Sequence, residues 1–186
     1  MWVNLASDQD LQLSASGEDG VGVEETSAEN LVLRCARADD SPHLLAWRND
    51  PAAVKNSESL HAITFDIHQA WFEMALTSDE CFLLVAEQKA SDALGMNRVG
   101  TCRFDLVSTH SAAVSLNVNP FFRGQGFSLR VLREGIQIFS KHFSSIESLA
   151  AKILPTNRAS QKVFFTSGFR LVDSSQRFGR WEKRIS

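Results

Sequence analysis

The chain has 186 residues and is 44% hydrophobic, with 13 Phe and 4 Trp, which is enough apolar material for one domain with a real core. A net charge of −3 excludes a strongly basic nucleic-acid-coating protein, and no apolar run approaches membrane-spanning length. Cys35, Cys81 and Cys102 are widely spaced in apolar, strand-like runs, so we expect reduced core residues, no metal site and a cytoplasmic location.

The first 29 residues differ in charge from the rest of the chain. They hold seven acidic residues and no Lys or Arg, and they are rich in Ser and Gly. This composition is typical of disorder, so we expect an acidic tail over 1–29 and one domain over 30–186. Alternatively, the short apolar runs 2–5 or 11–13 dock on the domain or on a partner subunit. Residues 30–186 contain 15 acidic and 19 basic residues. Their net charge of +4 suits a small anionic ligand.

Hydrophobic spacing predicts the elements in chain order. We expect strands over 31–36, 82–86, 98–106, 113–118 and 148–154, with a terminal hairpin of 169–172 and 181–185. Helices are expected from Ser41-Pro42 to a stop at Asn49-Asp50-Pro51, over 66–76, over 128–143, and from Asn157 to a C-terminal glycine at 168. A loop carrying His61 and a long hairpin connection over 88–97 join them. This order predicts a mixed α/β sheet with helices on both faces, in which 113–118 and 148–154 are parallel neighbours.

A glycine-containing loop stands between the predicted strand 113–118 and the helix that follows it. Residues 119–129 read Asn-Pro-Phe-Phe-Arg-Gly-Gln-Gly-Phe-Ser-Leu. Backbone N–H groups at the start of a helix attract anions, and glycines allow close approach, so this loop indicates an anion site, most often one for phosphate. Alternatively, the glycines serve only to bend the chain.

Two spaced motifs resemble the GNAT (GCN5-related N-acetyltransferase) family. Arg123, Gly126 and Ser128 match its Gln/Arg-x-x-Gly-x-Gly/Ala loop, with Ser in the last position. Downstream, the family's Asn, Tyr and Gly-Phe correspond to Asn157, Phe164 and Gly168-Phe169. The resemblance implies a mostly antiparallel sheet of six to seven strands, a splayed pair 113–118 and 148–154, and acetyl-CoA as co-substrate. It implies that the cofactor contacts Leu116, Asn117, Val118, Arg123, Gly124, Gln125, Gly126, Phe127, Ser128, Asn157 and Phe164.

Three further segments resemble a bacterial branch of that family. They are Trp47-Arg-Asn-Asp50, His68-x-x-Trp71-Phe72 and Gly100-x-x-Arg103-Phe104-Asp105. The branch includes sugar-nucleotide N-acetyltransferases of the pseudaminic-acid pathway and neighbours the ribosomal-protein N-terminal acetyltransferases. The resemblance places the acceptor amine near Trp47, Arg48, Asn49, His61 and Arg103. Each of these residues also has a purely structural interpretation. Trp47 and Trp71 can anchor the core, Asn49 and Asp50 can be turn residues, and Arg103 can be a solvated strand residue.

The chemistry implied by the resemblance requires a base, because a primary alkyl amine titrates near ~10.4. Strand 113–118 has no carboxylate, so Asp105 on the neighbouring strand is the candidate, ahead of His61, His68 and His110. The family's acid Tyr is Phe164 here, and the chain contains no Tyr. The expected activity is acetyl transfer to an amino sugar nucleotide. The alternatives are acetylation of a protein or peptide N-terminus and a non-catalytic CoA-binding protein. Relatives often form homodimers, but the sequence fixes neither the acceptor nor the oligomeric state.

Overall fold

The computed structural model describes residues 31–89 and 95–185. Seven strands form one sheet in the order β1-β2-β3-β4-β5-β7-β6. The strands are β1 (Leu31–Cys35), β2 (Cys81–Lys89), β3 (Met96–Ser108), β4 (Ser111–Val118), β5 (Ser148–Ile153), β6 (Arg170–Asp173) and β7 (Gly179–Arg184). The helices are α1 (Ser41–Arg48), α2 (Pro51–Lys55), α3 (Phe65–Thr77), α4 (Phe127–His142) and α5 (Arg158–Thr166), with short 3₁₀ turns η1 (Ala38–Asp40) and η2 (Pro120–Phe122). The predicted acidic tail and positions 90–94 of the predicted connection lie outside the described residues.

The sheet confirms the predicted mixture of pairings. All neighbouring strands are antiparallel except β4 and β5, which are parallel as expected. Their register covers only Ser111–Ala113 against Ser148–Ala150. Further along, these two strands are not paired with each other in the described structure, so they diverge toward the end of β4 from which α4 departs.

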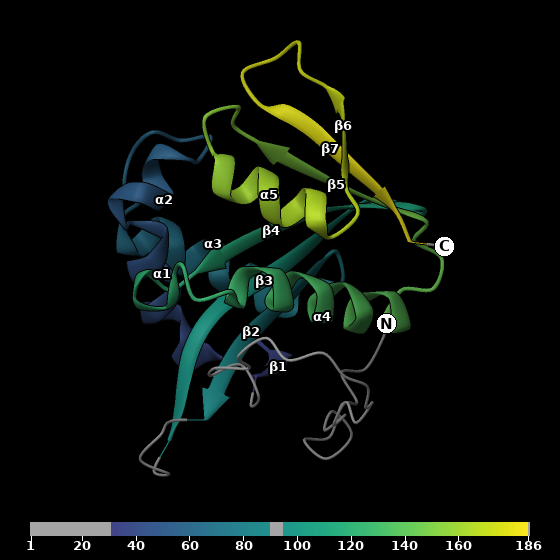
Figure 1. Cartoon of the computed structure of the whole chain (residues 1–186). Coiled ribbons are helices and arrows are strands. Elements are labelled where there is room, and N and C mark those ends of the chain that lie inside the picture. Colours follow the sequence, from purple (N-terminus) through teal and green to yellow (C-terminus); the bar gives the residue numbers. More distant parts are fainter. Residues whose placement is uncertain (1–30, 90–94, 186) are drawn as a thin grey trace, which may run out of the picture.

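Two apolar clusters lie on opposite faces of the sheet, because alternate side chains of a strand point to opposite sides. On β2, Leu84 packs in the cluster that contains α4, whereas Leu83 and Val85 pack with Trp47 of α1 and Phe72 of α3. Figure 1 shows α4 and α5 in front of the sheet and α3 behind it. The helices in residues 31–89 and 95–185 are too short or too polar to cross a membrane.

The structure corrects two sequence-based expectations. The chain does not pass directly into a loop at Pro51: Asp50 accepts hydrogen bonds from the backbone N–H groups of Ala52 and Ala53 and caps the short helix α2. Asp followed by Pro is a helix-start signal, so the sequence did contain a signal for α2. Cys35, expected in the core, is exposed, whereas Cys102 is fully buried.

Candidate functional site

The loop before α4 has an open backbone. Gly124 and Gly126 adopt φ values of 78° and 85°, in the left-handed region that favours glycine. A Cβ built on either glycine would meet no atom of the described structure within 4 Å. The side chain of Asn119 accepts a hydrogen bond from the N–H of Phe121 (3.1 Å) and fixes the start of this turn. The space beside the two glycines is therefore accessible to a ligand.

The N-terminus of α4 offers unpaired backbone donors. No side chain among the described residues caps this helix, whose N-cap is Gly126. The N–H groups of Phe127, Ser128 and Leu129 belong to the first turn of the helix, where intrahelical acceptors do not exist. They also carry the positive end of the helix dipole. Such an arrangement of donors is suited to an anion.

Arg123 does not extend freely toward that anion site. Its Nη1 lies 2.5 Å from Oδ1 of Asp50, and its Nε donates a hydrogen bond to the carbonyl oxygen of Val118 (3.1 Å). The hydrogen bond from Arg123 lowers the pKa of Asp50. The loop before α4 is thereby joined to the start of α2, a link that the sequence analysis missed.

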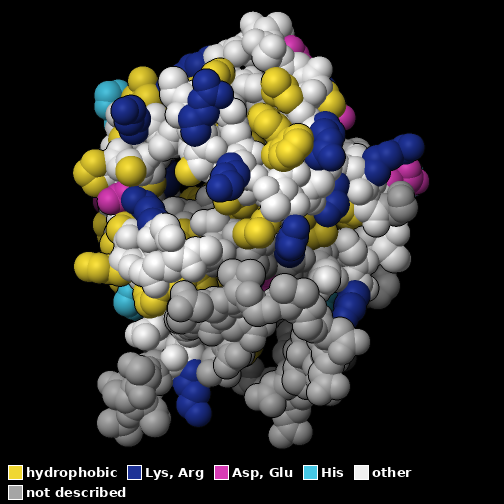
Figure 2. All heavy atoms as spheres, viewed as in Figure 1, with side chains coloured by type: hydrophobic (Ala, Val, Ile, Leu, Met, Phe, Trp, Pro, Cys, Tyr) yellow, Lys and Arg dark blue, Asp and Glu magenta, His cyan; other side chains and the backbone are white. Residues whose placement is uncertain are grey.

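The face around α4 and α5 is basic. Figure 2 shows Lys and Arg side chains spread across this face with few acidic ones among them. The two helices contribute Arg130, Arg133, Lys141, Arg158 and Lys162, and their sole acidic residue is Glu134. Glu134 is neutralised by Arg130 at 3.2 Å, four positions earlier on the same helix. The surface near the anion site therefore favours a ligand with several negative charges.

The end of β4 presents backbone groups to the gap between β4 and β5. The N–H of Asn119 donates to the carbonyl of Val99 on β3 (2.9 Å). Backbone groups alternate in direction along an antiparallel ladder, so those of Asn117 also face β3, whereas those of Leu116 and Val118 face the gap. The carbonyl of Val118 is already occupied by Arg123. Of the three predicted β4 contacts, Leu116 and Val118 are thus placed to bind a ligand in the gap.

The two predicted α5 residues have different environments. Asn157 accepts a hydrogen bond from the N–H of Ser160 (3.1 Å) and caps α5 with its side-chain oxygen. Phe164 is buried, and its ring packs edge-on against Phe169 with 5.0 Å between ring centroids. Since Phe carries no hydroxyl, this position contributes packing and no proton donor.

Asp105, the candidate base, lies on the face of β3 opposite α4, next to Arg103 and Trp71. Its Oδ2 is 3.0 Å from Nε of Arg103, without the alignment of a hydrogen bond. The guanidinium of Arg103 lies over the Trp71 ring, 5.2 Å from its centroid. With 40% of its side chain exposed, Asp105 can meet a substrate. Opposite it on β2, burial and Asp105 raise the pKa of Cys81 to about 11, which disfavours its thiolate form.

The other residues predicted near the acceptor mostly build the framework. Trp47 is buried in the α1–α3 cluster, and Arg48 donates a hydrogen bond to Ser59 Oγ (2.6 Å). Asn49 both donates to and accepts from the backbone of Ile63, at 2.8 Å each. His61 is exposed on the same loop. The contacts of Arg48 and Asn49 shape the 56–64 loop, so Trp47, Arg48 and Asn49 have structural roles here.

The 56–64 loop contacts β5 and the turn between β6 and β7. Lys152 of β5 forms an ion pair with Glu58 (2.8 Å), and Arg177 of the β6–β7 turn donates to the backbone oxygen of Glu58 (3.4 Å). The sequence analysis missed both contacts. Lys152 alternates with the buried Ala151 and Ile153, which does predict an outward-facing side chain.

Residues 30–170 match the Acetyltransferase (GNAT) domain family. The chain belongs to the GNAT acetyltransferase family. This membership, which covers most of the chain, makes the protein an acyltransferase enzyme. No curated protein matches the sequence significantly.

Solved structures share the GNAT fold at low sequence identity. A domain from Methanocaldococcus jannaschii is 16% identical, with a TM-score of 0.71 over 83% of this chain and 98% of its own. Spermidine N-acetyltransferase from Vibrio cholerae, solved with CoA and spermine, is 14% identical, with a TM-score of 0.70 over 83% and 95%. A ribosomal L7/L12 alpha-N-protein acetyltransferase, solved with coenzyme A, is also 14% identical, with a TM-score of 0.70 over 86% and 96%. These likenesses establish the fold.

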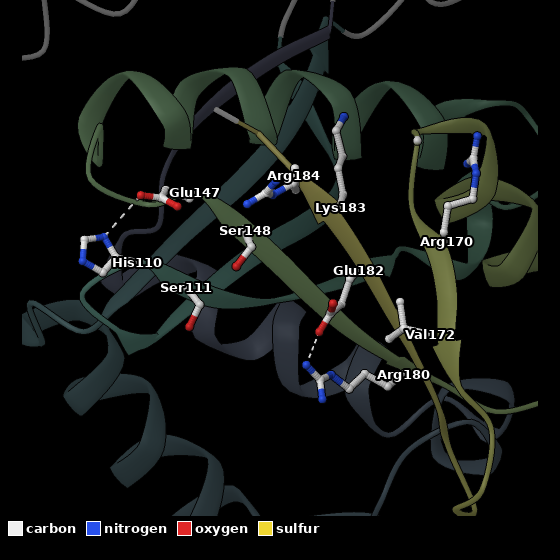
Figure 3. A pocket seen from close by; sticks show the side chains of 11 residues that line it. His110, Ser111, Glu147, Ser148, Arg170, Val172, Arg180, Glu182, Lys183 and Arg184 are labelled. Atoms are coloured by element: carbon white, nitrogen blue, oxygen red, sulfur yellow. Dashed lines mark hydrogen bonds and ion pairs between the residues drawn. The ribbon is translucent and has the colours of Figure 1, made fainter.

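A separate hollow of about 710 Å³ lies at the other end of the GNAT sheet, near the starts of β4 and β5. It is lined by Ser111, Ser148 and residues of β6 and β7, and Figure 3 shows that its side chains do not converge. Lys183 reaches toward α4, whereas Arg180 and Glu182 leave β7 on the other side. Within residues 31–89 and 95–185, no group of three or more His, Cys, Asp or Glu side chains could hold a metal ion.

Proposed function

We propose that this protein is an acetyl-CoA-dependent N-acetyltransferase that binds the cofactor diphosphate on the N–H groups of residues 124–129. The observation that carries the proposal is the uncapped start of α4 beside two left-handed glycines whose Cβ positions are open. Each hydrogen bond to a charged acceptor contributes about 1.5–3 kcal/mol, so a few such donors suffice. The basic residues of α4 and α5 add long-range attraction for the same group.

The gap between β4 and β5 fits the amide-containing arm of the cofactor. Leu116 and Val118 direct backbone groups into this gap, and the side-chain NH₂ group of Asn157 would donate from α5. The thioester would then lie near Ala113 and Ala150, where the parallel pairing ends. Gln125, Gly126, Phe127 and Ser128 complete the proposed cofactor site at the other end of the arm.

Acetyl-CoA supplies an acetyl group that is already activated as a thioester. On the protein side, Asp105 would accept a proton from the acceptor ammonium, because only the neutral amine is a nucleophile. Arg103 would hold Asp105 in place. The thiolate would leave without help from Phe164, which is feasible since a free thiol titrates near ~8.5. Positioning would therefore provide most of the rate enhancement.

An acceptor that carries a negative charge, such as an amino sugar nucleotide, suits the surface around Asp105. The aromatic partner of Arg103 is Trp71, and such a stacked guanidinium is suited to phosphate recognition. Further basic side chains lie on the neighbouring loop, strand and turn: Arg48 donates to Ser59, and Lys152 and Arg177 both contact Glu58. An acceptor peptide N-terminus, the runner-up, would favour an acidic groove instead.

Two measurements test this function. Calorimetry with CoA should show binding of the intact chain, and chromatography should show CoA release when acetyl-CoA is incubated with UDP-linked amino sugars. Chromatography avoids thiol reagents, which would also label the exposed Cys35. Absence of CoA binding would refute the cofactor site. Reaction with peptide amines while every sugar nucleotide stays inert would refute the sugar acceptor and retain the enzyme class.

A further inference from the structure

An ion pair attaches the proposed cofactor loop to the acceptor side of the molecule. Arg123 and Asp50 are 73 positions apart in the chain, yet their Nη1 and Oδ1 atoms are 2.5 Å apart. Both side chains are largely shielded, with 33% and 19% of their surfaces exposed. An ion pair in this setting is screened less by salt than one at the surface.

Arg123 is fixed at three atoms. Its Nη1 binds Asp50, its Nε donates to Val118, and its backbone N–H donates to Pro120 (3.4 Å). The chain then turns directly into the left-handed Gly124. On the other side of that glycine, Gln125 donates its side-chain N–H to the carbonyl of Phe121 (2.8 Å). The direction of the open amides at 124–126 therefore depends on how Arg123 and Gln125 are anchored.

Asp50 is also held firmly. It caps α2 through Ala52 and Ala53, and its neighbour Asn49 fixes the 56–64 loop at Ile63. The carboxylate that receives Arg123 is thus part of a junction held by several hydrogen bonds. These two contacts use Nη1 and Nε and do not involve Nη2, so they fix the place of the guanidinium, and a rotation of the whole group toward the diphosphate would break both.

We propose that Asp50 is a positioning residue for the cofactor: by holding Arg123 it fixes the loop 123–126 and raises the affinity for CoA without contacting it. The inference rests on the proposed function. It assigns Arg123 an indirect role, in contrast to direct contact with the phosphate. It also makes the junction of α1 and α2 a part of the cofactor site.

Calorimetry with CoA on the full chain tests this proposal with Asp50→Ser, Arg123→Gln and the double variant. Serine retains an N-cap oxygen for α2, so Asp50→Ser removes the charge and leaves the cap. We expect each single variant to weaken CoA binding about tenfold, as loss of a shielded charge pair would. The double variant should be no weaker than either one, because both changes remove the same contact. With acetyl-CoA varied, KM should rise while kcat changes little.

Asp39→Ser is the control for a general loss of charge, since Asp39 also pairs with an arginine, Arg98 at 2.5 Å, and lies on η1, outside the loop 123–126. Its CoA affinity should equal that of the wild type. Tighter CoA binding by Asp50→Ser would show that Arg123 contacts the phosphate itself and that Asp50 competes for it, which overturns the proposal. Unchanged binding by Asp50→Ser would overturn it as well. If the wild-type protein fails to bind CoA, the proposed function itself is wrong.

Discussion

Replacement of Asp40 should test the link between a buried carboxylate and the acid stability of the fold. The Asp40 side chain has no exposed surface and accepts two hydrogen bonds from Arg34, at 2.7 and 2.9 Å. It also accepts from Nε of Arg98 (2.6 Å) and from the backbone N–H of Arg37 (2.8 Å). Burial alone would raise the pKa of this group, but the bonds from Arg34, Arg37 and Arg98 prevail and lower it to about 2.

The magnitude follows from that value. The ordinary pKa is 3.8, so the lowering is about 1.8 pH units, and each unit corresponds to about 1.36 kcal/mol. Because the pKa is lower in the folded state, the stabilisation of about 2.4 kcal/mol is fully present above pH 3.8. It is lost as the pH falls from there toward 2. Asp40→Asn should also cost about 3–5 kcal/mol at pH 7, because Arg34 and Arg98 lose a buried partner.

Urea denaturation of the wild type and Asp40→Asn at pH 5 and pH 2 measures both quantities. The difference in unfolding free energy between the two proteins should shrink by about 2 kcal/mol on going to pH 2, where Asp40 is half protonated in the folded state. Asp39→Asn is the control: its side chain is 68% exposed, and its loss should cost less than about 1 kcal/mol. A difference between wild type and Asp40→Asn that stays constant from pH 5 to pH 2 would refute the assignment of the acid sensitivity to Asp40.

Three further outcomes are expected. Phe164→Tyr should raise kcat for acetyl transfer at least about tenfold by supplying a proton donor, and an unchanged kcat in a folded variant would remove this position from the mechanism. Burial lowers the pKa of His68, whose Nε2 contacts the Ser41 carbonyl (3.0 Å). The contribution of His68 to stability should therefore be present above pH 6.5 and lost below it. The variant His68→Gln should abolish this pH dependence in thermal melts. Gly135→Ala should lower the free energy of unfolding by about 1–3 kcal/mol, because the new Cβ would meet Cys102 Sγ at 2.9 Å. If the additional change Cys102→Ala restores no stability in urea titrations, this clash is not the cause.

Local patterns predicted the sheet, its parallel pair and four of the five α-helices. These features depend on side-chain periodicity and on capping residues within a few positions of one another. Asn157 was identified this way and caps its helix as expected, and the helix predicted over 128–143 is observed over Phe127–His142. The short helix α2 was missed because Pro51 can either end one helix or start the next.

The sequence by itself determined the fold and the glycine turn at the start of α4, since glycine conformation and helix ends are properties of consecutive residues. Only the tertiary structure decided which charges meet. Arg123 binds Asp50, and Lys152 binds Glu58 at a separation of 94 positions. Trp47 and Asn49 likewise became framework residues through contacts with distant segments. Ion pairs and side-chain hydrogen bonds form between the groups that tertiary packing brings together, and the local sequence pattern does not predict these partners.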